Sequence, residues 1–186
     1  MLQLTNSNLT LMNTPLKSLA FFLVVPIVLA GCQDDRPEPV TETDVHQTAA
    51  AQNEELAMDF IEAFNTRDRA ALEELLTDPF TYDGEEMERD AYLNLVESNV
   101  WNTFPDIECD PTHIVGAVDY VTVHLVWRGT GTGEILGHNI DGQEFEFTET
   151  GLFRVRDGQL AEYTYNYDEL GLLEHLGLLE SPFPGE

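Results

Sequence analysis

The feature that most constrains the fold is a change in hydrophobic periodicity at Pro105. Before it, apolar residues recur every three or four positions, as Ala57, Phe60 and Phe64 do, which is one face of an amphipathic helix. After it they alternate, most clearly from Val121 to Trp127, which is the pattern of a half-buried strand. Helices followed by hairpin-linked strands predict an α+β fold with a curved antiparallel sheet over a helical layer.

Helical patterns predict three helices before Pro105. One begins at Asn53, a short one is capped by Asp68 and stopped by Asp78-Pro79, and one covers 88–102. No strong strand is expected in this half. After Pro105, strands are expected over 121–127, 143–156 and 159–167, with Asp157-Gly158 as a hairpin turn, before a short last helix over 168–176.

The charge of the chain excludes one class of partner. The 186 residues carry 8 Lys+Arg against 35 Asp+Glu, a formal net charge of -27 that repels nucleic acid. A hydrophobic content of 42% still supplies a core. Such an acidic balance suits a medium of high ionic strength, where screening relieves self-repulsion, and we expect no nucleic-acid partner.

The N-terminal segment has the layout of a signal peptide over residues 1–31. Lys17 precedes an apolar run, Leu19 to Ala30, that is shorter than the ~20 residues of a membrane span. Met12 is an alternative start. The run ends in Leu-Ala-Gly-Cys32, which resembles the lipobox of bacterial lipoproteins; in an ordinary secretory signal Cys32 would be incidental. The resemblance implies a lipid on Cys32 and a membrane-anchored protein of the cell envelope, facing the periplasm or the exterior.

Residues 32–52 are polar, acidic and contain Pro37 and Pro39, so we expect a flexible tether there. The folded domain is expected over 53–180, and 181–186 form a tail.

Six motifs in order across 53–179 resemble the SnoaL-like polyketide cyclase, or ester cyclase, family of the cone-shaped nuclear transport factor 2-like fold. They are Phe60-Ile-Glu-Ala-Phe-Asn65, Phe104-Pro105-Asp106, Gly129-Thr-Gly-Thr-Gly-Glu134, Asp141-Gly142, Gly151-Leu-Phe-Arg-Val-Arg-Asp-Gly158 and Asp168-Glu-Leu-Gly-Leu-Leu-Glu-His-Leu-Gly177. The chain departs from the family at Gly131, where a His is common, and at Glu162-Tyr163-Thr164, where Glu-His-Trp is common.

The resemblance implies an acid/base at Asp168 for an intramolecular aldol ring closure, a small hydrophobic carbonyl compound as ligand, and no metal or organic cofactor. Alternation places Asp168 on one strand face with Glu162, Thr164 and Asn166, a polar row that we expect to line the cone. The other interpretation of Asp168 is a cap of the last helix. A non-catalytic binding or envelope-assembly module is the alternative function.

Further candidates have structural alternatives. Tyr82, His124 and Trp127 are expected to contact a ligand, although a structural role fits each of them. The opposite strand face carries Tyr163, Tyr165 and Tyr167, an aromatic stripe that predicts either a homodimer interface or packing against the chain's own helices. Asp106, Glu108 and Asp110 lack a calcium-loop pattern and are expected to be a solvated acidic face. Cys109 is expected to be buried.

Overall fold

Helix α1 (Glu42–Thr66) buries the apolar face that its sequence predicts, with Ala57, Phe60 and Phe64 in the core. The computed structural model describes residues 42–135 and 137–180, all within one unit, Pro39–Glu186. Because α1 begins at Glu42, the expected tether boundary at residue 52 is wrong. Acidic residues in the first turn and the alanines at 49–51 favour the earlier start. The signal segment, Cys32 and the tail lie outside the described residues.

Helix α2 (Arg69–Leu75) has the expected cap, since the Asp68 carboxylate accepts a hydrogen bond from the backbone N–H of Ala71 at 3.1 Å. It ends at Leu75 rather than at Asp78-Pro79, because strand β1 (Leu76–Tyr82) follows at once.

The prediction of no strand before Pro105 is therefore wrong. β1 pairs with β2 (Glu85–Met87) and, in parallel, with a strand far along the chain, β8. Asp83 and Gly84 join β1 to β2 with φ of 48° and 83°, the left-handed backbone that Asp-Gly turns supply. The Asp-Gly dipeptide is a hairpin signal in the sequence, but β1 also pairs with β8, which lies far along the chain.

The expected third helix is observed as α3 (Arg89–Leu95) continuing into a π-helical segment, η1 (Val96–Trp101). Its wider turn includes a bond from the N–H of Asn102 to the carbonyl of Glu97 at 3.2 Å. Val96 and Trp101, five positions apart, both become buried, which an α-helical turn would not achieve on one side.

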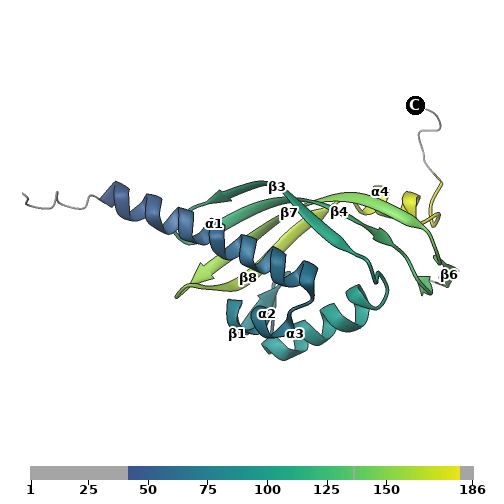
Figure 1. The fold of residues 1–186 in the computed structure, drawn as a ribbon, viewed down its shortest axis with the longest axis horizontal. Helices are drawn as coiled ribbons and strands as arrows, with labels where there is room; N and C mark the ends of the chain where they lie inside the picture. Colours follow the sequence, from purple (N-terminus) through teal and green to yellow (C-terminus); the bar gives the residue numbers. More distant parts are fainter. Residues whose placement is uncertain (1–41, 136, 181–186) are drawn as a thin grey trace, which may run out of the picture. The chain divides into compact units, whose positions relative to one another are not determined.

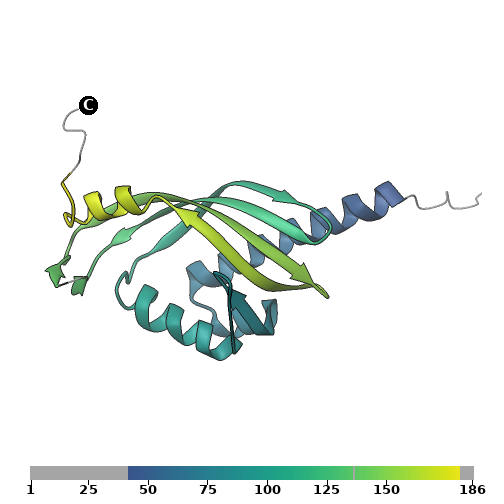
Figure 2. The ribbon, with the colours of Figure 1, turned by 180° about the vertical axis from the view of Figure 1, so that it is seen from behind.

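The main sheet has the strand order β2-β1-β8-β7-β4-β3, antiparallel except between β1 and β8. The expected strands are confirmed, and Asp157-Gly158 forms the turn between β7 and β8. Figures 1 and 2 show the long strands curving over α1, α2 and α3. The remaining elements are β3 (Glu108–Gly116), β4 (Tyr120–Thr130), β5 (Glu134–Ile135), β6 (His138–Asn139), β7 (Glu144–Arg156), β8 (Gln159–Tyr167) and α4 (Glu169–His175).

Alternation along the strands gives the sheet an inner face toward the helices and an outer face toward solvent. Val121 and Val123 of β4, Phe153 of β7 and Leu160 of β8 are buried on the inner face. Within the described part of the chain, no helix has the length and apolar character needed to cross a bilayer.

Candidate functional site

A cavity of about 220 Å³ lies between the inner face of the sheet and the segments α1, α3 and η1. Its walls are almost entirely aromatic and aliphatic side chains, including Phe64, Trp127, Tyr163 and Tyr165. Among the described residues that line it, Glu149 carries the one carboxyl, and no Lys, Arg or His joins it. The cavity therefore favours an uncharged, largely apolar ligand.

Glu149 is 8% exposed and accepts a hydrogen bond from the hydroxyl of Tyr163. Burial raises the pKa of Glu149 from its ordinary 4.5 to about 7, against the lowering effect of Tyr163 and, to a smaller degree, of the Trp127 indole N–H. That N–H has no partner with normal hydrogen-bond geometry among the described residues, so we assign it only an electrostatic influence. Near neutral pH the carboxyl is thus both acid and base.

Strand β7 places Glu149 in the cavity because its odd-numbered residues face inward. The row runs Phe145, Phe147, Glu149, Gly151 and Phe153, so one acidic residue stands in an otherwise apolar row. A Cβ on Gly151 would lie 2.5 Å from Cε2 of Tyr163. Gly151 therefore leaves the room that the Tyr163 ring needs to reach Glu149.

Strand β8 supplies an aromatic wall. The rings of Tyr163 and Tyr165 are stacked with centroids 5.5 Å apart, and Tyr167 continues the row at 6.0 Å from Tyr165. From β1, Tyr82 stacks on Tyr165 at 5.5 Å, and its hydroxyl donates to that of Tyr165 at 3.0 Å. Flat faces and a few hydroxyls suit a planar ligand with polar atoms at its edge.

The structure brings two of the sequence-predicted ligand residues, Tyr82 and Trp127, into the cavity wall. The other three, His124, Thr164 and Asn166, do not line it. His124 lies on the outer face, within 3.0 Å of the Thr150 hydroxyl. The alternation of β8 was predicted correctly, but the polar row faces outward and the tyrosine row faces inward. The tyrosines line the cavity, so this row gives no support to a homodimer interface.

Asp168 is exposed and caps α4, its carboxylate accepting from the N–H of Gly171 at 3.0 Å. It does not line the cavity. The capping interpretation is confirmed, whereas an acid/base role for Asp168 stays a prediction.

The remaining acidic and thiol candidates have structural roles. Asp106 accepts from the N–H of Thr130 at 2.7 Å, and Asp110 pairs with Arg128 at 2.6 Å. Cys109 is 2% exposed as expected, and burial raises the pKa of its thiol to about 12. Over residues 42–135 and 137–180, no three His, Cys, Asp or Glu side chains gather as metal ligands.

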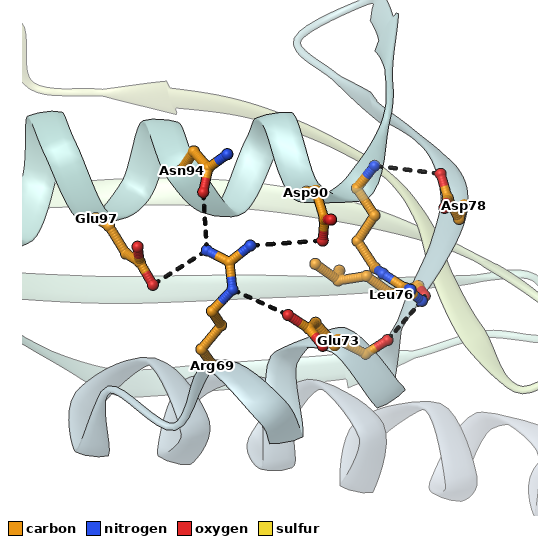
Figure 3. A network of polar contacts seen from close by, with 8 residues as sticks. Arg69, Glu73, Leu76, Asp78, Asp90, Asn94 and Glu97 are labelled. Atoms are coloured by element: carbon orange, nitrogen blue, oxygen red, sulfur yellow. Dashed lines mark hydrogen bonds and ion pairs between the residues drawn. The ribbon is translucent and has the colours of Figure 1, made fainter.

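The helices beneath the cavity are joined by Arg69 of α2. Its guanidinium binds Glu73 at 2.9 Å in its own helix, and Asp90 at 3.4 Å and Glu97 at 3.1 Å in α3 and η1 (Figure 3). The Asn94 side chain accepts a further bond at 3.1 Å. Since Leu95, Val96 and Val100 line the cavity, Arg69 holds the segment that forms its floor.

A curved sheet that encloses an apolar cavity against three N-terminal helices defines a domain of the nuclear transport factor 2-like fold. The chain belongs to the SnoaL-like polyketide cyclase family, whose family model matches residues 55–176, more than half of the sequence. Comparison with the curated proteins gives no match.

Solved structures agree with this assignment. IdmH from Streptomyces antibioticus, described as a proposed polyketide cyclase, is 28% identical over 68% of this chain and 99% of its own, with a TM-score of 0.62. TsrD from Streptomyces laurentii is 24% identical over 69% of this chain and 97% of its own, with a TM-score of 0.62, and shares the fold. AclR from Streptomyces galilaeus, described as a proposed hydroxylase, also shares it, at 22% identity over 71% of this chain and 89% of its own, with a TM-score of 0.63.

Proposed function

We propose that this domain binds a small, flat, uncharged carbonyl compound and moves a proton on it, with Glu149 as the acid/base. The observation that carries the proposal is a single buried carboxyl in an aromatic cavity, with its pKa raised to about 7 by burial. A general base works best when its pKa lies near the working pH. The family assignment and the description of IdmH as a proposed polyketide cyclase support carbonyl chemistry.

The reaction class follows from what one carboxylate can do. Glu149 takes a proton from the carbon beside a carbonyl, the C–H bond breaks, and its electron pair moves to the carbonyl oxygen as an enolate. The enolate carbon then either recovers a proton from Glu149 or attacks a second carbonyl of the same ligand, which is an aldol ring closure. In the ring closure, the new alkoxide takes the proton that Glu149 holds. Both paths therefore return Glu149 to its carboxylate, and neither consumes a cofactor.

A non-catalytic ligand carrier is the second candidate. It is favoured by the position of Asp168, which matches the family's acid/base by sequence but lies outside the cavity as a helix cap. In that case the aromatic walls bind a ligand and Glu149 only fixes its orientation.

Deuterium exchange separates the two functions. The full-length chain is incubated in D₂O with 2-tetralone and with 1,3-dicarbonyl compounds, and exchange beside the carbonyl is followed by NMR. We expect Glu149→Gln to lose about 10²-fold or more of the rate, and Asp168→Asn, which keeps a capping oxygen, to stay near the wild type. Ligand binding by the wild type without exchange above the buffer rate would leave the carrier function.

We also propose that the domain is a lipoprotein anchored through Cys32 to a membrane of the cell envelope. The support is the Leu-Ala-Gly-Cys32 sequence after an apolar run. Several acyl chains hold a protein firmly to a bilayer. Cys32→Ser should release the chain from the membrane fraction or block its processing, and an unchanged membrane fraction and size would reject the anchor.

A further inference from the structure

The cavity holds a second polar group that the chemistry of Glu149 does not use, the hydroxyl pair of Tyr82 and Tyr165. Their oxygens are 3.0 Å apart and their rings are stacked at 27°. Both residues line the cavity, and they come from β1 and β8, which pair in parallel.

The Tyr82–Tyr165 pair has one hydroxyl hydrogen available for a further hydrogen bond. Two hydroxyls carry two hydrogens, and one of them lies between the two oxygens. Tyr82 donates, so the unused hydrogen is that of Tyr165, and it meets no acceptor within residues 42–135 and 137–180. A hydroxyl that accepts a hydrogen bond is a stronger donor itself, so Tyr82 polarises Tyr165 toward the cavity.

Tyr82 remains a neutral phenol in the cavity. Burial, and after it the hydrogen bond to Tyr165, raise the pKa of Tyr82 well above its ordinary value. Its phenol therefore stays neutral beyond the pH range in which an ordinary tyrosine ionises. The nearby Glu149 carboxylate acts in the same direction, because a second negative charge in the cavity is disfavoured.

We propose that Tyr165 donates its free hydrogen to the carbonyl oxygen of the ligand while Glu149 exchanges the proton on the neighbouring carbon. This inference rests on the proposed function and assigns the oxygen-binding residue of that site. When the C–H bond breaks, its electron pair moves to the oxygen, and the hydrogen bond from Tyr165 strengthens as that oxygen becomes negative. No other reactant is consumed.

The Tyr163–Glu149 pair and the Tyr82–Tyr165 pair together define the ligand. With Glu149 ionised, the cavity offers an acceptor at Glu149 and a donor at Tyr165, beside each other because Tyr163, the partner of Glu149, stacks next to Tyr165. A ketone with an acidic C–H beside its carbonyl, on a planar apolar skeleton, satisfies both. A carboxylate or phosphate ligand does not, since no cationic side chain lines this cavity among the described residues.

The test uses 2-tetralone and its hydrocarbon counterpart tetralin as probes of the full-length chain. Infrared spectroscopy reports the carbonyl stretch of bound 2-tetralone, which a hydrogen bond lowers. Dissociation constants of both probes are measured for the wild type, Tyr165→Phe, Tyr82→Phe and the control Tyr120→Phe. Tyr120 lies on β4 outside the cavity lining, so its variant loses a hydroxyl without touching the site.

We expect Tyr165→Phe to bind 2-tetralone about threefold to tenfold more weakly, to bind tetralin unchanged, and to return the stretch toward its value in an apolar solvent. Tyr82→Phe should reduce the shift partly, and Tyr120→Phe should match the wild type. The proposal would be overturned if Tyr165→Phe kept the wild-type carbonyl stretch and the wild-type ratio of 2-tetralone to tetralin affinity. It would also be overturned if Tyr82→Phe changed the stretch and the 2-tetralone affinity more than Tyr165→Phe does.

Tetralin binding checks the fold of each variant. If Tyr165→Phe no longer binds tetralin, the Tyr82→Phe variant tests the proposal instead. An unreduced shift of the carbonyl stretch in Tyr82→Phe would refute the polarisation of Tyr165. Both readouts need no turnover. Failure of wild-type exchange would therefore count against the proposed function, while a shift that depends on Tyr165 would still establish the oxygen site.

Discussion

Gly151 determines how closely Tyr163 approaches Glu149. A methyl group at this position would lie 2.5 Å from both Cε2 and the hydroxyl oxygen of Tyr163, so the ring must move. We expect Gly151→Ala to cost about 1 to 3 kcal/mol of unfolding free energy, the usual range for an overpacked core. It should also remove the Tyr163 hydrogen bond, which lowers the pKa of Glu149, and so shift the pH midpoint of proton exchange upward.

Tyr163→Phe is the matched variant, because it removes the same hydrogen bond without steric conflict. Both variants should shift the pH midpoint of exchange in the same direction, while only Gly151→Ala should lose much stability in urea unfolding. A wild-type midpoint in Gly151→Ala would show that the ring does not depend on Gly151.

The sequence predicts part of the cavity wall but not the carboxyl at its centre. Tyr82 and Trp127 were predicted to contact a ligand and do line the cavity. The sequence pattern does not single out Glu149, because the apolar residues of its strand dominate that pattern. The usable signal was an acidic residue in phase with Phe145, Phe147 and Phe153, since a charge on a buried face needs a functional or structural reason.

Strand alternation is easier to predict than which face turns inward. The spacing of β8 fixed two faces, one polar and one aromatic, and local pattern alone did not decide which would face the helices. The decision comes from partners on β1 and β7, namely Tyr82 and Phe153, which stack against Tyr163. β1 was missed for the same reason, because its pairing with β8 joins segments far apart in sequence.

We expect the contact between α2 and the α3–η1 segment to depend on the ion pairs of Arg69. Arg69→Met leaves the carboxylates of Glu73, Asp90 and Glu97 close together without their shared cation. We expect a loss of about 1 to 2 kcal/mol in urea unfolding, more than one exposed ion pair contributes because several contacts are lost together. The loss should shrink at high salt, since screening weakens the attraction in the wild type.

Arg156→Met is the control for this change, because it also removes one positive charge. Arg156 is exposed at the end of β7 and has no ion pair within the part of the chain that the structure describes. Equal losses in the two variants would trace the effect to net charge and would contradict a specific role for Arg69.

The whole chain carries a formal charge of -27, so self-repulsion opposes its folding. We expect the urea midpoint to rise as NaCl is raised from about 0.05 to 1 M, because the Debye length falls from about 14 Å to 3 Å over this range. Sodium sulfate would also strengthen hydrophobic burial, so NaCl is the salt to use. A midpoint that falls with NaCl would contradict dominant repulsion.

Burial of Glu149 gives the whole fold a pH-dependent stability. Between pH 4.5 and about 7, the folded chain holds a proton on Glu149 that the unfolded chain has released, because burial raises the pKa of this carboxyl. Stability therefore falls as pH rises through this window and levels off above it. At 1.36 kcal/mol per pKa unit, the full cost is about 3 kcal/mol.

Glu149→Gln removes this contribution, since the amide cannot ionise and resembles the protonated acid in size. We expect the free energy of unfolding of Glu149→Gln minus that of the wild type to increase by about 3 kcal/mol between pH 4.5 and pH 8, measured by urea unfolding at fixed NaCl. The contributions of the other carboxylates cancel in this difference. Glu144→Gln, exposed at the start of the same strand, controls for the loss of one charge.

If the Glu149→Gln and wild-type curves stay parallel across this range, Glu149 is not held in its protonated form by the fold. Proton transfer at neutral pH would then need another residue. A more stable variant that has lost proton exchange would instead show that the fold gives up stability to keep an ionisable group in its cavity.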